Sequence, residues 1–561
     1  MKRFGNYIIC FMLACSFQVK AQQIPVNISI DFSENQGELK KIWRFFGCDE
    51  PNYAYMDNGK KLIKQLGELY PQKVYFRTHN LLTTGDGTPA LKWGSTNAYT
   101  EDVNGNPIYD WTILDKIFDT YLMNGVKPYV QIGFMPEAMS VNPIPYKHSW
   151  DPSKNYNNIT TGWAYPPKDY KKWEELSYEW VKHCINRYGK EEVEKWYWQT
   201  WNEPNHKNYW KGTIEEFLKL HDHAINGVLR ALPTAIVGGP DVAGHGGEFT
   251  KAFIEHCLRG KNFATGETGT PLKFISFHAK GSPEFVDGHV SMNMAPQLKN
   301  IEEGFIMINS YPELKNIPII IGESDLEGFA ACQGEKYGYR NGTMYSSYTA
   351  ASFMRKYDLS EKYDVNLEGA LTWAFEFENQ PYFAGFRSLA TNGIDKPVLN
   401  VFRMFGKMEG NRVKVISNSE VPLDEIIKKS VKENPDISAI ASVNENKLYV
   451  MLWYYHDNDT TGPTAKIQLK MQNLRVANGK ATVRSFLVDK TNGNAYTKWL
   501  QLGSPQMPSK KQYFEMEKSS QFVENKFSND LIINNNQLEL EVELERQGVM
   551  LLIAELSEKA K

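Results

Sequence analysis

The sequence predicts an α/β fold, a (β/α)8 barrel of the TIM type followed by a C-terminal antiparallel β-sandwich. Two patterns lead to this prediction. Between about residues 43 and 410, strand-like apolar runs alternate with amphipathic helical stretches. After about residue 410, short segments alternate apolar and polar residues instead. The chain has 561 residues, enough for two large domains.

Eight strands account for the first pattern, with amphipathic helices such as Tyr170–Tyr188 and Ile214–Leu232 between them. The predicted strands are Phe45–Asp49, Val74–His79, Pro128–Phe134, Lys195–Trp201, Ala235–Gly239, Phe274–Lys280, Pro318–Glu323 and Ala370–Phe375. A doubly wound open sheet is the competing fold. No glycine-rich phosphate loop follows any of these strands, so a nucleotide-binding sheet has no support.

The C-terminal pattern predicts a sandwich over residues 411–561, after a catalytic barrel over 43–410. Residues 22–42 contain an early strand, Val26–Phe32, that we expect to join the sandwich. The polar stretch Ser504–Asp530 is predicted to be a long loop. The sandwich strands are Ile437–Val443, Lys447–Tyr455, Ala465–Met471, Ala481–Asp489, Leu538–Leu544 and Gly548–Leu556.

The N-terminus has the pattern of a signal peptide over residues 1–21. A basic start is followed by a short apolar run and by Ala21 at the expected cleavage site. Acylation at Cys15, which would give a lipid-anchored protein, is the alternative. We therefore expect an exported protein, periplasmic or extracellular. No later apolar stretch reaches the roughly 20 residues of a transmembrane helix.

Composition excludes several classes of function. The formal net charge is −3, from 63 basic and 66 acidic residues, so a general nucleic-acid binder is excluded. The six cysteines form no Cys-x-x-Cys pair, and His221 and His223 are two apart, which on a helix puts them on different faces. We predict no metal ion and no cofactor. The sequence leaves the oligomeric state open.

A glutamate ends the aromatic run Trp196–Trp201 in the order Asn202, Glu203, Pro204. At the C-terminal end of a barrel strand, a side chain points into the mouth where active sites lie. Asn202 is placed to contact a sugar 2-hydroxyl while Glu203 protonates a glycosidic oxygen. The sequence therefore predicts Glu203 as a general acid at the end of strand four.

Glu323 ends the apolar run that reads as strand seven and is the predicted partner carboxylate. Asp325 and Glu327 are rivals, although loop carboxylates are more often solvated charges. Two carboxylates across one barrel mouth predict glycoside hydrolysis, with the carboxyl groups about 5–5.5 Å apart if the enzyme retains configuration. We also expect repulsion between the two charges to raise the pKa of Glu203.

Four further polar or aromatic residues end neighbouring strands and are candidate sugar contacts. These are His79 on strand two, His278 and Lys280 on strand six, and Trp373 on strand eight. Each could instead be a satisfied core residue. Several at the same end of different strands favour a binding site.

These residues lie in motifs that resemble glycoside hydrolase family 39, the retaining β-xylosidases and α-L-iduronidases. The resemblance covers about residues 43–410, and the sandwich also fits the family. Tyr109–Trp111 through Phe134–Pro136 is similar to the xylosidase branch, as is Trp373–Phe375. Stretches similar to α-L-iduronidase are Arg77–Leu82, His256–Glu267, Phe277–Gly281 and Glu323–Asp325.

The resemblance implies a role for each site residue. Glu203 would be the acid/base and Glu323 the nucleophile, while His79, His278 and Asn202 would contact the sugar. Lys280, with Arg387 near a second basic position, would bind a substrate carboxylate. Glu376 or Glu378 would contact the outer hydroxyls.

The remaining question is which sugar is removed. A β-D-xyloside and an α-L-iduronide share ring configuration from C1 to C4 and differ by a carboxylate on C5. Because Lys280 supplies a cation, we predict an exo-acting retaining glycosidase that removes a terminal uronic acid from a polysaccharide or oligosaccharide. A β-xylosidase is the first alternative. A carbohydrate-binding protein without catalysis is the alternative from another class.

Overall fold

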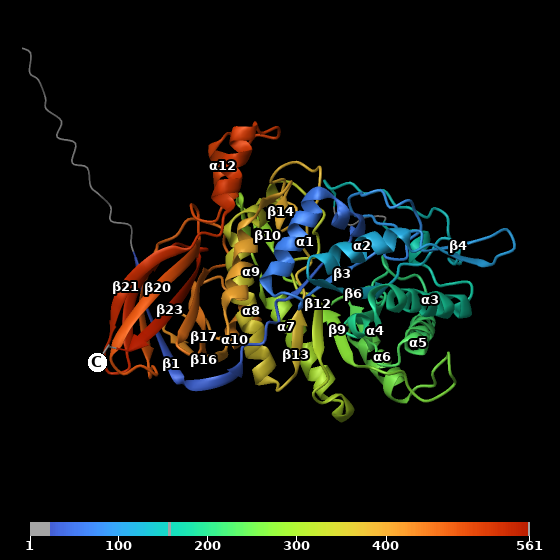
Figure 1. Ribbon diagram of the computed structural model, residues 1–561, viewed down its shortest axis with the longest axis horizontal. Helices are drawn as coiled ribbons and strands as arrows, with labels where there is room; N and C mark the ends of the chain where they lie inside the picture. The colour runs from blue at the N-terminus through green and yellow to red at the C-terminus, as the bar shows by residue number, and fades with distance from the viewer. Residues whose placement is uncertain (1–22, 155–158, 559–561) are drawn as a thin grey trace, which may run out of the picture.

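The computed structural model describes residues 23–154 and 159–558. The predicted signal peptide and Cys15 lie outside the described residues. Figure 1 shows a barrel at one end of the molecule and a large sheet at the other. Among the described residues, no helix is both long and apolar enough to cross a membrane.

Eight parallel strands form the barrel, as predicted, in the order β13-β12-β9-β8-β7-β6-β3-β2. A parallel bridge between Phe46 and Thr372 brings the two ends of this sheet together. The strands are β2 (Phe45–Cys48), β3 (Val74–Thr78), β6 (Val126–Ile132), β7 (Tyr197–Thr200), β8 (Ile236–Val242), β9 (Phe274–His278), β12 (Ile319–Glu323) and β13 (Leu367–Ala370). Strands buried on both faces need continuous apolar runs, which explains their sequences.

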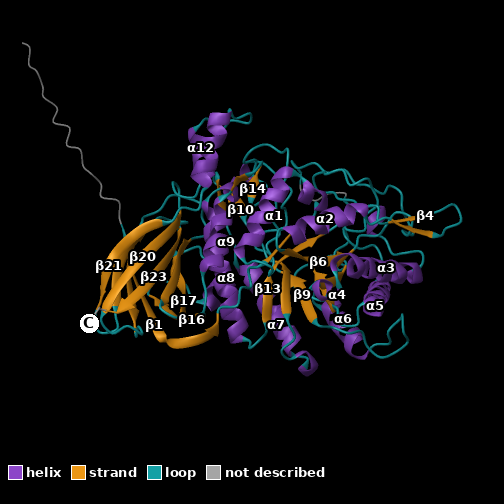
Figure 2. Cartoon of the chain, in the orientation of Figure 1, coloured by secondary structure: helices purple, strands orange, loops and turns teal. Residues whose placement is uncertain are grey.

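A helix follows each barrel strand and covers its outer face (Figure 2). These helices are α1 (Asp57–Leu69), α2 (Thr112–Met123), α3 (Tyr170–Tyr188), α5 (Ile214–Ala231), α6 (Glu248–Arg259), α7 (Ala295–Asn309), α8 (Thr343–Lys362) and α9 (Pro397–Lys407). Helix α5 begins at a capping box, in which Thr213 and Glu216 bond each other's backbone N–H groups. Its buried face includes Phe217, Leu220 and Ala224, at the spacing of an amphipathic helix.

The C-terminal region is a nine-stranded sheet in the order β21-β20-β23-β18-β17-β16-β1-β19-β22. Its strands are β1 (Ile24–Glu38), β16 (Asn411–Ser417), β17 (Asp436–Asn444), β18 (Lys447–Tyr455), β19 (Ala465–Gln472), β20 (Gly479–Val488), β21 (Asn525–Ile533), β22 (Leu538–Leu544) and β23 (Val549–Glu558). As predicted, the N-terminal strand joins it. β1 pairs antiparallel with β16 and parallel with β19, the one parallel pair among these described strands.

Both faces of the middle of this sheet are buried. In β18, Leu448, Val450 and Leu452 belong to the core inside the curled sheet. The alternate residues Met451 and Trp453 belong to the core shared with the barrel. Because successive side chains point to opposite faces, a strand with two buried faces has no polar alternation. Helices α8 and α9 stand between the barrel strands and this sheet (Figure 2).

The prediction that Ser504–Asp530 is a loop was wrong. Helix α12 (Lys510–Ser520) stands out from the body of the molecule, and β21 begins at Asn525. A capping box between Ser509 and Gln512 begins the helix. Its one buried apolar side chain, Met516, packs in a small cluster with Trp499. A nearly polar helix has no apolar periodicity, which is why the pattern failed here.

Arg355 of helix α8 joins the barrel to the sheet. Its guanidinium lies 2.8 Å from Oδ1 of Asp436 on β17 and 2.7 Å from Glu420. Asp436 also accepts a hydrogen bond from Trp453. Both Arg355 and Asp436 are fully buried, so each charge depends on the other.

We expect Arg355→Leu to lower the free energy of unfolding by about 3–5 kcal/mol, because Asp436 would keep a buried, unpaired charge. The control is Arg187→Leu, which removes a surface pair with Asp119 and should cost under about 1 kcal/mol. Urea denaturation followed by tryptophan fluorescence measures both. Equal losses in the two variants would contradict a special role for the buried pair.

Candidate active site

A cavity of about 240 Å³ opens at the C-terminal ends of the barrel strands. Active sites of (β/α)8 barrels lie at this face, because the loops after the strands meet there. The lining residues are Asp49, His79, Lys92, Ile159, Glu203, His206, Asn208, Tyr209, Ala243, Lys280, Glu323, Gly328, Phe329 and Trp373. Five of the predicted site residues are therefore brought together: His79, Glu203, Lys280, Glu323 and Trp373.

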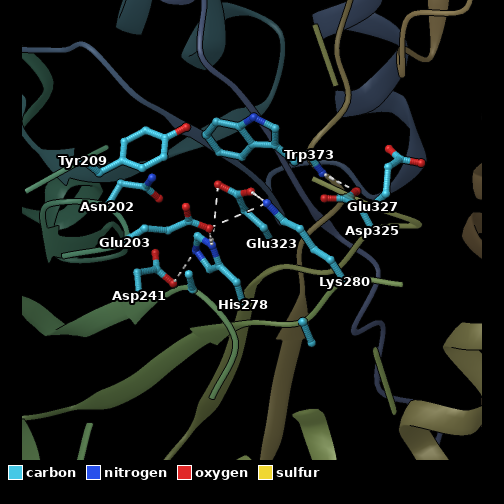
Figure 3. A network of polar contacts seen from close by, with 12 residues as sticks. Asn202, Glu203, Tyr209, Asp241, His278, Lys280, Glu323, Asp325, Glu327 and Trp373 are labelled. Atoms are coloured by element: carbon cyan, nitrogen blue, oxygen red, sulfur yellow. Dashed lines mark hydrogen bonds and ion pairs between the residues drawn. The ribbon is translucent and has the colours of Figure 1, made fainter. Parts of the chain in front are cut away.

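The two predicted catalytic carboxylates face the same space (Figure 3). One oxygen of Glu203, one oxygen of Glu323 and a ring nitrogen of His278 all lie within 4.8 Å of one another. Retaining glycosidases hold their carboxyl groups about 5–5.5 Å apart, whereas inverting enzymes need about 6.5–9.5 Å for a water molecule. The separation fits the retaining geometry.

The backbone after β7 turns sharply to present Glu203. Trp201 and Glu203 both have left-handed backbone angles, with φ of 66° and 44°. The N–H of Glu203 donates to the carbonyl oxygen of Asp241, at 2.9 Å. Such conformations are costly for residues with a side chain and persist only where the surroundings fix them. The turn holds the Glu203 carboxylate in the barrel mouth.

Glu323 is surrounded by cations. The ammonium of Lys280 lies 2.5 Å from its Oε2, and Arg77 lies 3.4 Å from its Oε1. Burial would raise the pKa of Glu323, but the charge of Lys280 and its cationic neighbours outweigh burial and hold the pKa well below its usual range. Glu323 is therefore ionised, which is the state that attack on a sugar carbon would require.

Glu203 is also ionised in this site, which corrects the expectation from charge repulsion. Burial and Glu323 both raise its pKa, but Lys280, 3.8 Å away, and His278 lower it more, to about 2. His278 donates from Nδ1 to Oε1 of Glu203, at 2.8 Å. Repulsion between the two carboxylates is present, yet the cations beside them dominate.

The two active-site histidines differ in charge. Burial lowers the pKa of His79, which donates from Nδ1 to Asp49 at 2.6 Å and is neutral. For His278, burial lowers the pKa, but the charges of Glu323 and Asp241 outweigh it and raise the pKa to about 9. A neutral ring thus flanks Glu323, and an imidazolium flanks Glu203.

Glu203, His278 and Glu323 are also the one group among the described residues with the spacing of a metal site. A cation of the protein competes for these carboxylates. The Lys280 ammonium already occupies the space beside Glu323.

Asn202 and Trp373 lie beside the carboxylates, where sugar contacts were predicted. Oδ1 of Asn202 accepts from Arg77 at 2.9 Å, while its Nδ2 is buried without a hydrogen-bond partner in the described part of the chain. A buried donor of this kind is suited to a substrate hydroxyl. The Trp373 ring packs on His79, with 4.2 Å between ring centroids, and supplies an aromatic wall.

Three predicted site residues neither line the cavity nor contact Glu203 or Glu323. Glu376 accepts from the N–H of Gly393, and Glu378 accepts from the N–H of Gly59. Burial raises the pKa of Glu376 to about 8. Arg387 is fully buried behind the site. Their predicted contacts with substrate remain predictions without support from this geometry.

Asp325 and Glu327, the rivals of Glu323, are buried rather than solvated. Asp325 lies 3.3 Å from Arg387 and accepts from the N–H of Trp373 at 3.0 Å. Glu327 lies 2.8 Å from Arg387 and 2.9 Å from Arg340. They form ion pairs behind the cavity, on the far side of Lys280 from Glu203 (Figure 3). Glu323 alone of the three lines the cavity.

Sequence reasoning did not select several residues of this site. Arg77 lies in a stretch noted for its resemblance, two residues before His79, and Asp49 ends the first predicted strand. Asp241 follows the strand-five sequence Gly-Gly-Pro. The rule that strand-end residues face the mouth could have found Asp49. Lys92 and Tyr209 come from loops, where no periodicity marks them.

The chain is similar to known glycosidases over most of its length. Residues 26–529 match the model of "Glycosyl hydrolases family 39". The chain is 26% identical to a β-xylosidase of Caldicellulosiruptor saccharolyticus, over 91% of this chain and 95% of the relative. It is 25% identical to α-L-iduronidase of Mus musculus, over 61% of this chain and 56% of that protein.

A solved structure has the same fold across nearly the whole chain. The monomeric β-xylosidase of Caulobacter crescentus CB15 superposes with a TM-score of 0.72 at 18% identity, covering 94% of this chain and 99% of that one. The family match covers most of this chain, and one oxygen of Glu203 lies within 4.8 Å of one oxygen of Glu323, closer than the spacing of inverting enzymes. The chain therefore belongs to glycoside hydrolase family 39 and is an O-glycosyl hydrolase.

Proposed function

We propose that this enzyme is an exo-acting β-xylosidase, the alternative to the uronic acid reading of the sequence. The main observation is that the cations at and behind the cavity are already paired with carboxylates of the protein. Lys280 is paired with Glu323, and Lys92 is paired with Asp49. Arg387 is buried among Asp325 and Glu327. Lys280 and Arg387, the two cations expected to bind a C5 carboxylate, and the cavity residue Lys92 thus each already have a carboxylate of the protein beside them.

The size of the cavity supports an exo-acting enzyme. Its volume of about 240 Å³ lies below the range of pockets that bury drug-sized ligands and suits a single sugar ring. The rings of Tyr209 and Trp373 lie across the carboxylates from His278 (Figure 3). Aromatic faces of this kind pack against the apolar face of a sugar.

The mechanism follows from the two carboxylates. Glu323 attacks the anomeric carbon while the carboxyl of Glu203 protonates the departing oxygen, which gives a covalent glycosyl-enzyme. Glu203 then takes a proton from water, and the resulting attack on the anomeric carbon releases the sugar and frees Glu323. Asn202 would hold the 2-hydroxyl through its unpartnered Nδ2.

A terminal uronic acid is the second candidate, and one observation favours it. The side chain of Lys280 is 21% exposed and lines the cavity, so a substrate carboxylate could compete with Glu323 for its ammonium. The similarity to α-L-iduronidase of Mus musculus supports the same candidate. We also propose export to the periplasm or outside the cell, which is supported by the leader pattern of residues 1–21.

Replacing Glu203 with Ala is expected to slow substrates with poor leaving groups most, by roughly 10²–10⁴-fold, because those need the proton. Activated aryl glycosides should lose far less in the glycosylation step. Glu323→Ala should abolish turnover of both kinds. Steady-state kinetics on matched pairs of glycosides measures this. Equal losses for both leaving groups in Glu203→Ala would contradict the assignment of the acid.

Wild-type enzyme is expected to cleave an aryl β-D-xyloside better than an aryl α-L-iduronide. Lys280→Met should lower kcat/KM on the xyloside by roughly 10- to 150-fold, because Glu323 would lose a charge-assisted hydrogen bond. The measurement compares both substrates on both proteins. If the variant keeps its xyloside activity and loses only iduronide activity, the uronic acid candidate replaces the xylosidase.

A further inference from the structure

We propose that Asp241 is a positioning residue that keeps the proton on His278, and that His278 in turn supplies the proton that Glu203 gives to the leaving group. The inference rests on Glu203 being the proton donor, as proposed above. It does not depend on whether the sugar is a xylose or a uronic acid.

Asp241 contacts both halves of the catalytic machinery. Its side chain is fully buried at the end of β8, with Oδ2 lying 2.8 Å from Arg77 and Oδ1 lying 3.3 Å from Nε2 of His278. Its carbonyl oxygen accepts the N–H of Glu203. One residue therefore fixes the backbone of the acid/base, orients the ring beside it, and holds the arginine that reaches Glu323.

The space for the Asp241 carboxylate is created next to the nucleophile. Gly322 directly precedes Glu323 on β12, and a Cβ atom there would lie 1.8 Å from Oδ1 of Asp241. The Asp241 carboxylate could move away from such a Cβ atom only by losing its contacts with Arg77 and His278. The absence of a side chain at position 322 is thus tied to the presence of this carboxylate.

The charges around His278 explain why Asp241 matters for its proton. The ring faces Glu203 from strand four at 2.8 Å, Asp241 from strand five at 3.3 Å and Glu323 from strand seven at 3.8 Å. Lys280, two residues after the end of β9, and Arg77, held by Asp241, oppose the carboxylates. Burial lowers the pKa of His278, but the carboxylates, Glu323 and Asp241 first, outweigh burial and raise it to about 9.

Of the three carboxylates, Asp241 alone neither forms a bond nor exchanges a proton in this scheme. Glu323 becomes an uncharged ester in the glycosyl-enzyme, and Glu203 gains and loses a proton. When glycosylation neutralises Glu323, the charge of Asp241 still favours a proton on the ring. The Asp241 carboxylate lies at Nε2 of His278, opposite Glu203 at Nδ1. It therefore favours the return of the proton to the ring after each turnover.

The proton path is short and conserves charge. His278 passes its Nδ1 proton to Oε1 of Glu203, and the carboxyl releases it to the glycosidic oxygen. The bond from the anomeric carbon to that oxygen breaks, and a bond from Glu323 to the carbon forms. In the second half, the water that attacks the glycosyl-enzyme gives its proton to Glu203, from which it returns to His278.

Asp241→Asn tests the inference, because it removes the charge and keeps the shape. We expect the alkaline limb of the kcat/KM profile to move to lower pH by about one unit or more for a poor leaving group. An activated leaving group, which needs no proton, should keep most of its activity. The matched control is Asp222→Asn, which removes another buried carboxylate, paired with His256 outside the cavity. It should keep the wild-type profile.

If Asp241 has only a structural role, Asp241→Asn should lower activity on poor and activated leaving groups alike at every pH. The alkaline limb of the kcat/KM profile would then stay at its wild-type pH, and that result would overturn the inference. A second measurement needs no variant at position 241. NMR of histidine-labelled wild-type protein, with His278 assigned by its loss in His278→Gln, should show an imidazolium from neutral pH to about pH 9. A neutral His278 ring at pH 7 would overturn the inference even if Asp241→Asn fails to fold. Equal losses in Glu203→Ala would instead count against the proposed acid.

Discussion

Three carboxylates are buried in one barrel mouth, and the cost of burying unpaired charge governs the arrangement around them. Glu203, Asp241 and Glu323 lie at the ends of strands four, five and seven, and each is met by a cation from another strand. An ionised carboxylate in a dry interior is stable only when such partners are close. The cations Arg77, His278 and Lys280 therefore belong to the same charge network as Glu203 and Glu323.

This constraint extends behind the cavity and away from it. Arg387 and Arg340 neutralise Asp325 and Glu327, the two carboxylates that follow the nucleophile along the chain. Farther out, Arg355 and Asp436 pair across the junction of the barrel and the curled sheet. The first set of pairs holds the loop after strand seven, and the pair of Arg355 with Asp436 holds helix α8, which follows that loop. A catalytic carboxylate must be held to within a fraction of an ångström, which such supports make possible.

The same pairing bears on the choice of sugar. A cation of this site could recognise a uronic acid only by sharing or leaving a partner inside the protein, and for Lys280 that partner is Glu323. Pairing with Glu323 gives Lys280 a role in any retaining hydrolysis, whichever sugar is bound. A lysine in this position is therefore not by itself a marker of an acidic substrate.

The sequence by itself determined the barrel, the β1 strand that joins the C-terminal sheet, and the pair Glu203 and Glu323. Continuous apolar runs mark strands buried on both faces, and residues at strand ends must face the mouth. Local motifs carry the family because its catalytic residues sit in short, distinctive stretches of chain. The sequence pattern did not predict helix α12, because this helix buries only one apolar side chain, Met516.

Only the tertiary structure decided which charges meet. In the folded chain, Lys280 pairs with Glu323, and Asp241 lies beside His278. Glu376 and Glu378 accept hydrogen bonds from backbone N–H groups. Arg387 is buried beside Asp325. The tertiary structure also reversed the expected pKa shift of Glu203. A pKa depends on the sum of all charges within a few ångströms, and those charges come from strands separated by tens of residues along the chain. No local pattern contains that sum, because it exists only once the barrel has closed.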